Sequence, residues 1–180
     1  AASSVLPPPR FAQTMESPPG YIPTGLCSIA AVLRQNHFEC FIHDRNTNYM
    51  KLDDLAGHYD SAIYGISVLS GKVILDAIKI SKAIRERNPA SIIVWGGLHP
   101  TICPDSVLNE DYVDFIVRGE GEYPMTEFCN FIFNKKGDPA SILNLGYRSQ
   151  GKHILNPLRP LINLEELPKI PQICFRKAFT

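Results

Sequence analysis

The chain has 180 residues, of which 44% are hydrophobic, so it is long enough for one packed domain with an appendage or for one large domain. Its 18 Lys and Arg residues balance its 18 Asp and Glu residues, and it has no basic tract. A surface for nucleic acid or for an anionic membrane is therefore not expected. The longest apolar runs are far shorter than the roughly 20 residues that span a bilayer, and the start AASSVLPPPR lacks the pattern of a signal peptide.

The first part of the chain is proline-rich and then turns to regular patterns. SSVL at 3–6 is predicted to be a short first strand. Thr24, directly after Pro23, can cap a helix, and the apolar residues that follow it fall at helical spacing. FECFIH at 38–43 alternates between the two sides of a strand, which predicts a half-exposed strand, and LDDLAGHY predicts a short helix.

Two later segments, 62–69 and 92–95, are apolar nearly throughout, which is typical of strands buried on both faces. YVDFIV at 112–117 alternates and so predicts a strand with one exposed face. The apolar spacing in this part of the chain predicts helices at 73–87, 101–110 and 126–134.

Strands that alternate with helices predict an α/β fold with a parallel sheet. With 62–69 and 92–95 at the centre, and 38–43 and 112–117 at the edges, the five strands take the order 2-1-3-4-5, a flavodoxin-like (Rossmann-like), doubly wound sheet. After Gly137 the pattern changes to a β-hairpin around Gln150-Gly151, followed by an extended, proline-punctuated connector. We therefore predict a domain at 1–136 and a hairpin with a linker at 137–180.

The carboxyl ends of the predicted strands read PPPR, SVLSG, GGLHPT and RGEGE, and all are rich in small or turn-forming residues. In an open parallel sheet the ligand lies outside these ends. Gly96 and Gly97 would let a flat ligand approach the backbone, and His99 and Thr101 could bind amides or hydroxyls. Alternatively, the two glycines form only a tight strand-to-helix turn, and His99 is a helix-capping or solvated residue.

The other loops allow the same two readings. Ser67, Ser70 and Gly71 either face a ligand or provide a serine N-cap for the helix at 73–87. Gly119, Glu120 and Gly121 would permit close approach, whereas Glu122 could simply occupy the first turn of a helix, where the dipole favours it. No P-loop spacing and no GxGxxG motif is present, so the common nucleotide cradles are excluded.

The five cysteines are widely spaced, and no CxxC or CxxxCxxC motif connects them. A zinc ribbon or a three-cysteine iron–sulfur site cannot be built locally. We therefore predict reduced thiols, a cytoplasmic protein, no metal ligands and no iron–sulfur cluster in this chain. No residue is a convincing general acid, base or nucleophile, so the chain by itself is expected to bind rather than to catalyse.

The segment GGLHPTICPDSVLNEDYVDFIVRGEGE resembles the cobalamin-binding domain of B12-dependent radical S-adenosylmethionine enzymes, which show GG-x-H-x-T, a nearby proline and then V-D-x-[IV]-V-x-G-E-G-E. The early PPP, the segment SPPGYIPTGLCSIAAVLRQNHFECFIHD and the connector LGYRSQGKHILNPLRPLINLEELPKIP follow the same order, so the resemblance covers about residues 5–170. It implies that a corrinoid lies on the carboxyl edge of the sheet with its nucleotide tail inside the domain. Carried over by motif, the site residues are Ser67, Ser70, Gly96, Gly97, His99, Thr101, Gly119, Glu120 and Gly121.

Two departures refine this expectation. The loop after the first strand holds no histidine between Pro7 and Gly25, in contrast to the D-x-H-x-x-G of mutases and methionine synthase, so cobalt should have no histidine ligand. The cysteine motif of the family lies beyond Thr180, so S-adenosylmethionine and the [4Fe-4S] cluster are expected only in a barrel that this chain lacks. The resemblance implies a parent enzyme of the methyltransferase type.

Two other interpretations stay open. The chain could be a flavodoxin-like domain for FMN, another small ligand or a protein partner, although PPPRFAQT is a poor phosphate loop. It could also be a scaffold that binds nothing. Retention of cobalamin distinguishes both from the first interpretation.

Overall fold

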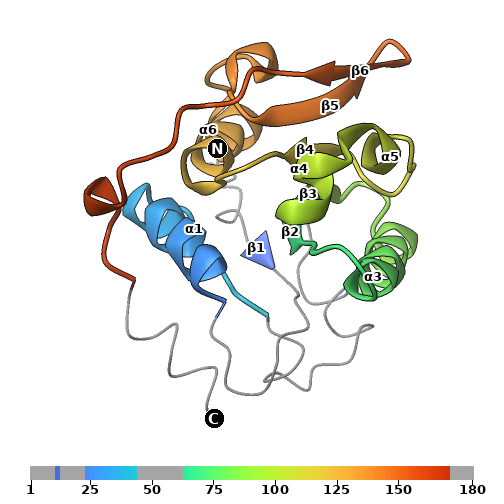
Figure 1. Ribbon diagram of the computed structural model, residues 1–180, viewed down its shortest axis with the longest axis horizontal. Helices are drawn as coiled ribbons and strands as arrows, with labels where there is room; N and C mark the ends of the chain where they lie inside the picture. The colour runs from blue at the N-terminus through green and yellow to red at the C-terminus, as the bar shows by residue number, and fades with distance from the viewer. Residues whose placement is uncertain (1–10, 13–22, 44–62, 171–180) are drawn as a thin grey trace, which may run out of the picture.

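The computed structural model describes residues 11–12, 23–43 and 63–170, and these residues form a six-stranded sheet in the order β1-β2-β3-β4-β5-β6 (Figure 1). The first four strands are parallel, and β5 and β6 are antiparallel to their neighbours. The strands are β1 (Phe11–Ala12), β2 (Ile63–Ser67), β3 (Ile92–Gly96), β4 (Phe115–Val117), β5 (Leu145–Ser149) and β6 (Lys152–Leu155).

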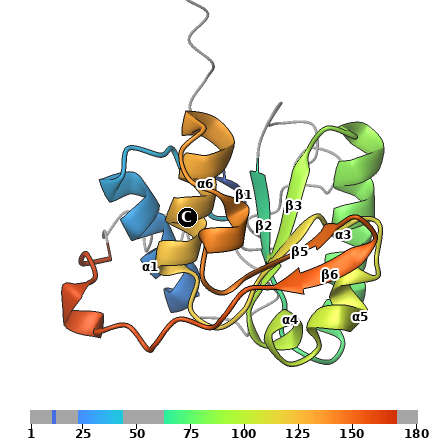
Figure 2. The same cartoon turned by 90° about the horizontal axis from the view of Figure 1, so that it is seen from above.

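The helices lie on both faces of this sheet, which is the predicted α/β fold class (Figure 2). The helix predicted at 73–87 is confirmed. The first helix begins at Thr24, but its N-cap is Pro23 and no side chain caps it, so Thr24 is not the cap that was predicted. The last predicted helix begins earlier, at Glu122, and 101–110 contains the end of one short helix (98–102) and the whole of a second (104–108). The helices are α1 (Thr24–Gln35), α3 (Val73–Arg87), α4 (Leu98–Ile102), α5 (Pro104–Leu108) and α6 (Glu122–Asn134), with 3-10 turns at Pro139–Ser141 and Leu164–Glu166. None of the helices in the described part of the chain has the length and apolar character needed to cross a membrane.

The two strands predicted to be central are central: β2 lies between β1 and β3, and β3 lies between β2 and β4. Their register runs from Ile63 opposite Ile92 to Ser67 opposite Gly96, so the carboxyl ends of β2 and β3 lie side by side. The predicted hairpin is also confirmed, because Gln150 and Gly151 both have positive φ (50° and 72°), as a tight two-residue turn requires.

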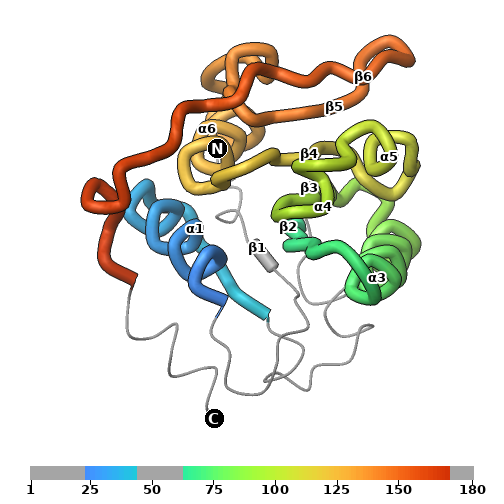
Figure 3. Tube along the Cα trace, in the orientation of Figure 1, coloured from blue at the N-terminus to red at the C-terminus, as the bar shows by residue number. Residues whose placement is uncertain are grey.

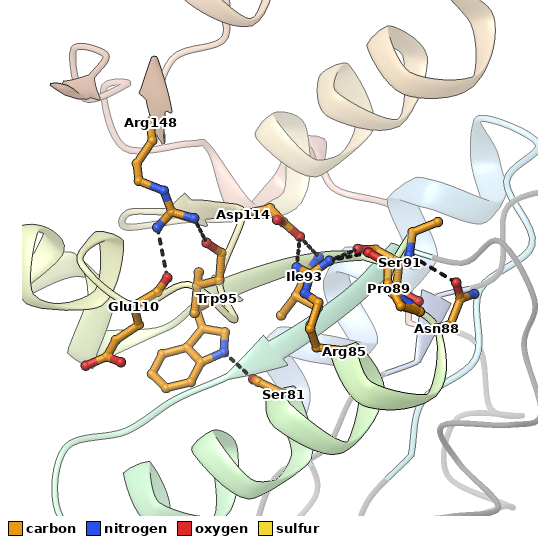
Figure 4. Close-up of polar contacts among 12 residues, drawn as sticks. Ser81, Arg85, Asn88, Pro89, Ser91, Ile93, Trp95, Glu110, Asp114 and Arg148 are labelled. Carbon is orange, nitrogen blue, oxygen red and sulfur yellow. Dashed lines mark hydrogen bonds and ion pairs between the residues drawn. The ribbon is translucent and has the colours of Figure 1, made fainter. Parts of the chain in front are cut away.

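The prediction that 112–117 is an edge strand was wrong, because β4 pairs with β3 on one side and with β5 on the other. The polar residue that produced the apparent alternation, Asp114, precedes the strand. Its Oδ2 accepts hydrogen bonds from the Ile93 amide (2.7 Å) and from Arg85 Nη2 (2.5 Å), as Figure 4 shows. The polar residue at position 114 is therefore explained by its hydrogen bonds to β3 and α3, and it does not mark an exposed face of a strand.

The segment 38–43, predicted to be an edge strand, is irregular in the structure, and its predicted neighbour at 3–6 lies outside the described residues, so its pairing stays a prediction. Phe38 and Cys40 are buried against the core, and Arg34 Nη2 donates to the Cys40 carbonyl (2.7 Å). Phe41, on the other side of the segment, packs in the other core layer, and His43 is 6% exposed, so the alternation separates two sides that are both buried. The predicted strand 3–6 and the helix LDDLAGHY lie outside the described residues. Beside β2 the structure has β1 at 11–12, and the strands predicted at 62–69, 92–95 and 112–117 follow one another as predicted.

The core has two layers, one on each face of the sheet. On the first, here called the α3/α5 face, α3 and α5 pack against Tyr64, Ile66, Ile93 and Trp95. On the second, the α1/α6 face, α1 and α6 pack with Ile63, Val94 and Val117. Because side chains alternate along a strand, odd positions of β2 and even positions of β3 face α1 and α6.

Candidate functional site

A cavity of about 260 Å³ lies at the carboxyl edge of the sheet, where β2, β3 and β4 meet the first turns of α1 and α6. Its walls come from three loops and two helices, so residues far apart in the sequence meet there. The lining residues are Gly25, Leu26, Ile29, Gly65, Ile66, Ser67, Val94, Gly96, Gly97, Val117, Gly119, Glu120, Gly121, Glu122 and Met125.

The cavity exists because the last positions of the strands on the α1/α6 face are small. Gly65 and Ser67 in β2, and Gly96 in β3, occupy positions where the α3/α5 face carries Tyr64, Ile66 and Trp95. A side chain at Gly96 would not be hindered by the backbone, because an added Cβ would meet only the Val117 carbonyl oxygen, at 3.7 Å. Glycine at this position therefore keeps space open without being required by the fold.

Six of the predicted site residues line the cavity, and four lie outside its lining. The lining residues are Ser67, Gly96, Gly97, Gly119, Glu120 and Gly121; the others are Ser70, Gly71, His99 and Thr101.

Gly97 is a glycine because the backbone requires it. Its φ is 92°, and an added Cβ would lie 3.1 Å from the Val68 carbonyl oxygen and 3.2 Å from Ser67 Oγ. The same turn is fixed by two backbone hydrogen bonds, from the Val68 amide to the Gly96 carbonyl (2.8 Å) and from the His99 amide to the Val68 carbonyl (3.0 Å). A Gly97→Val variant would strain this turn with or without a ligand, so Gly96 is the better position for testing ligand binding.

Thr101 joins two of the loops around the cavity. Its hydroxyl donates to the Gly97 carbonyl (2.7 Å) and accepts from the Gly119 amide (2.9 Å). One side chain thereby connects the turn after β3 to the turn after β4. Thr101 positions both loops and is engaged in the protein itself.

The loop after β2 is more exposed than predicted. Ser70 and Gly71 lie at the surface, and the N-cap position of α3 is Lys72, with no side-chain cap bond, so the prediction of a serine N-cap was wrong. Gly71 has a φ of 102°, which shows that the turn itself favours a glycine there. His99 is half-buried in α4.

Glu120 connects the cavity wall to the segment 156–170, here called the connector, which runs alongside α6 towards α1 (Figure 3). Glu120 Oε2 accepts a hydrogen bond from the Ile162 amide (2.9 Å). Asn144, which is 3% exposed, donates to the Glu120 carbonyl (3.0 Å) and accepts from the Arg159 amide (2.6 Å). The connector is therefore fixed to the same loop that forms one wall of the cavity.

Several lining residues were missed in the sequence. Gly65 interrupts an otherwise apolar strand, and an interior strand glycine often marks close approach of a ligand, so the signal was present. Ile29 and Met125 read as ordinary apolar core positions of α1 and α6, and nothing in the sequence separates a core position from a cavity wall.

Four of the five cysteines lie in the described part of the chain. The thiols of Cys27, Cys40 and Cys129 are buried, and burial, with the neighbouring Cys40, raises the pKa of Cys129 well above its usual range. Cys103 is exposed. In the ranges that the structure describes, no group of three His, Cys, Asp or Glu side chains could hold a metal ion. The cavity is thus suited to an organic ligand held by backbone, apolar and carboxylate groups.

These features define a Rossmann-like binding domain with a glycine-lined cavity at the carboxyl edge of its sheet. The sequence matches the B12 binding domain family over residues 16–129. The chain therefore belongs to the B12-binding domain family, which confirms the resemblance found in its loops.

The chain is also similar to individual proteins in sequence or in fold. The chain is 32% identical over 151 residues to an uncharacterized methyltransferase of Pyrococcus horikoshii, which covers 81% of this chain and 32% of that protein. The radical S-adenosylmethionine methyltransferase TsrM from Kitasatospora setae, solved with cobalamin and a [4Fe-4S] cluster, has a similar fold (TM-score 0.71, 18% identity, 88% of this chain, 30% of TsrM). So does the cobalamin-dependent S-adenosylmethionine radical enzyme OxsB with aqua-cobalamin bound (TM-score 0.76, 19% identity, 95% of this chain, 25% of OxsB). The chain spans about a third or less of each relative.

Proposed function

We propose that this chain is the cobalamin-binding module of a B12-dependent radical S-adenosylmethionine enzyme of the methyltransferase type, and that its ligand is a corrinoid. The observation that carries the proposal is the cavity itself. It lies at the carboxyl edge of the sheet, and small residues, Gly65, Ser67 and Gly96, hollow out the α1/α6 face there. Membership of the B12-binding family supports the same ligand.

The cavity bears on how a corrinoid would bind. We assign its space, about 260 Å³, to the nucleotide tail and not to the larger corrin ring. The ring would then lie over the loops that follow β2 and β3. Exposed apolar side chains are available there, because Leu69, Leu98 and Ile102 are 39%, 53% and 59% exposed. The ten residues predicted to form the site divide accordingly: those in the cavity face the tail, and Ser70, Gly71, His99 and Thr101 surround or position the loops beneath the ring.

We further propose that the corrinoid binds in the base-off form without a histidine ligand. The support is the absence of histidine between Pro7 and Gly25 and the placement of His99 outside the cavity lining. Bound cobalamin would supply the cobalt that carries the methyl group. S-adenosylmethionine and an iron–sulfur cluster would be bound by a barrel elsewhere in a longer, cytoplasmic parent protein, and we retain 1–136 and 137–180 as the proposed division of this chain.

The proposal is tested by incubating the purified chain with hydroxocobalamin, separating free ligand by gel filtration and recording the visible spectrum. A cobalamin spectrum of the base-off class that elutes with the protein is expected. Elution of the protein without cobalamin contradicts the proposal. A nitrogen-ligated spectrum that becomes base-off in His99→Ala would assign the lower ligand to His99 and overturn the histidine-free form.

A further inference from the structure

Glu122 is a buried acidic residue in the wall of the cavity. It is the first residue of α6, it is 8% exposed, and it lines the cavity. No hydrogen bond or ion pair reaches its carboxylate from the residues that the structure describes. Its carboxylate oxygens are not fully enclosed among the described residues, so a water-sized group can reach them.

Several other polar groups of the cavity and of the loops around it are engaged in the protein. The Thr126 hydroxyl donates to the Glu122 carbonyl (3.0 Å), and the Glu120 carboxylate accepts from the Ile162 amide (2.9 Å). The Thr101 hydroxyl joins Gly97 and Gly119. Glu122 is therefore a carboxylate at the cavity wall whose acceptor capacity the described residues leave unused. An acceptor buried without a partner is unfavourable, and a ligand that supplies a donor removes that cost.

The chemistry of a carboxylate decides which part of a ligand it can bind. An ionised carboxylate only accepts hydrogen bonds, so its partner must offer an O–H or N–H group. The first turn of a helix ordinarily favours an anion such as phosphate. Here Glu120 and Glu122 both lie at the start of α6, and like charges at such short range repel a phosphate.

We propose that Glu122 determines the specificity of the cavity: it accepts a hydrogen bond from an uncharged O–H or N–H donor on the nucleotide tail of the corrinoid and keeps the phosphate of that tail outside. This inference rests on the proposed function. The inference names the residue that recognises the nucleotide tail and the part of the tail that enters the cavity.

The test compares two probes that share the corrin ring. Hydroxocobalamin carries the nucleotide tail, and hydroxocobinamide lacks it. The affinities of both are measured by equilibrium dialysis for the parent chain, Glu122→Ala, Glu122→Gln and the control Glu86→Ala, which changes an exposed residue of α3 on the other face. Glu122→Ala should weaken cobalamin binding by about tenfold or more, the usual effect of losing a hydrogen bond to a charged group. Glu122→Gln keeps the shape and an oxygen acceptor and should lose less. Neither should change cobinamide binding.

Each outcome has one meaning. An equal loss for both probes, or no loss for either, overturns the role of Glu122. If the parent binds cobalamin and cobinamide equally well, the tail does not enter the cavity, and this inference fails while corrinoid binding stands. If the parent binds neither, the proposed function fails as well. A thermal unfolding curve of each variant shows whether it is folded, and the nearly isosteric Glu122→Gln carries the test if Glu122→Ala is not.

Discussion

The two faces of the sheet use the same strands for opposite purposes. On the α3/α5 face, β2 and β3 present Tyr64, Ile66 and Trp95, which are at most 3% exposed. On the α1/α6 face, the neighbouring positions are Gly65, Ser67 and Gly96, and a cavity takes the place of packed side chains. Because side chains alternate along a strand, one short sequence can fill one face and hollow the other.

The filled face contains paired polar groups, although Arg85 Nε of α3 is buried without a hydrogen bond. Trp95 Nε1 donates to Ser81 Oγ (2.9 Å), and both residues are almost fully buried, as Figure 4 shows. Arg148 Nη1 and Nη2 bind the carbonyls of Glu110 (2.8 Å) and Val113 (2.7 Å), which follow α5. The hollow face instead leaves the Glu122 carboxylate without a partner among the described residues. Both faces contain packed core residues, and the second also has the cavity that we propose for the ligand.

The largest expected effect is on the filled face. Trp95→Ala should lower the free energy of unfolding by about 3–5 kcal/mol, because it opens a cavity in the core and leaves the buried Ser81 hydroxyl without its donor. Urea unfolding followed by circular dichroism measures the change. Leu75→Ala on α3 is the control, since Leu75 is 62% exposed and should cost less than about 0.5 kcal/mol. A similar cost for both variants would contradict the packing of Trp95 in the core of the α3/α5 face.

The next effect is on the hollow face. Gly96→Val should weaken cobalamin binding by about 1–3 kcal/mol, roughly tenfold to a hundredfold, because the new side chain enters the space that the tail requires. The stability of the free protein should not fall, since the added Cβ meets only one backbone atom, at 3.7 Å. Ser149→Val, at an exposed position of β5, is the matched control for adding a branched side chain to a strand. Unchanged cobalamin affinity in Gly96→Val would place the ligand elsewhere.

A smaller effect is expected where two loops of the hollow face are joined. Thr101→Val keeps the shape of the side chain but removes both hydrogen bonds, so the free energy of unfolding should fall by about 1–2 kcal/mol. Cobalamin binding should weaken with it, because the turns after β3 and β4 lose their connection. Thr101→Ser restores the hydroxyl and should recover most of both quantities. Loss of binding in Thr101→Ser equal to that in Thr101→Val would show that the methyl group matters instead.

The smallest effect concerns pH and the filled face alone. Burial, and then the nearby carboxylates of Glu110 and Asp111, raise the pKa of Tyr112 from its usual 10 to about 12. The folded state therefore retains this proton where the unfolded chain loses it, so stability is present below pH 10 and falls as the pH rises from about 10 to 12. Tyr112→Phe should flatten this decline in a series of thermal melts. An equally steep decline in the variant would assign it to other groups.

Long, strongly patterned elements could be predicted from the sequence, and elements defined by distant partners could not. The helix at 73–87 and the central strands at 62–69 and 92–95 follow from local spacing alone. The edge prediction for 112–117 failed because β4 pairs with β5, which belongs to a hairpin more than twenty residues later in the chain. The hairpin could be predicted, but its pairing with β4 could not be predicted from a local pattern. For 38–43 the alternation marks two sides that pack in different core layers, and it could not show that the segment is irregular.

The site shows the same division. Glycines at strand ends indicated loops that line the cavity, because close approach needs a residue without a Cβ. Sequence could not show that Thr101 is engaged by Gly97 and Gly119, or that Glu120 binds the connector, since each partner comes from another loop. Nor could it separate Glu122 as a cavity residue from Glu122 as an ordinary first-turn residue of α6.

The placement of the ligand on the hollow face is tested most directly by amide hydrogen exchange with and without cobalamin. On cobalamin binding, we expect slower amide exchange at the carboxyl ends of β2, β3 and β4 and in the first turns of α1 and α6, where the cavity lies. Exchange in α3 and in the hairpin of β5 and β6 should stay as it is in the free protein. Protection centred on α3 or on that hairpin, with none at 65–67 and 96–97, would contradict the account.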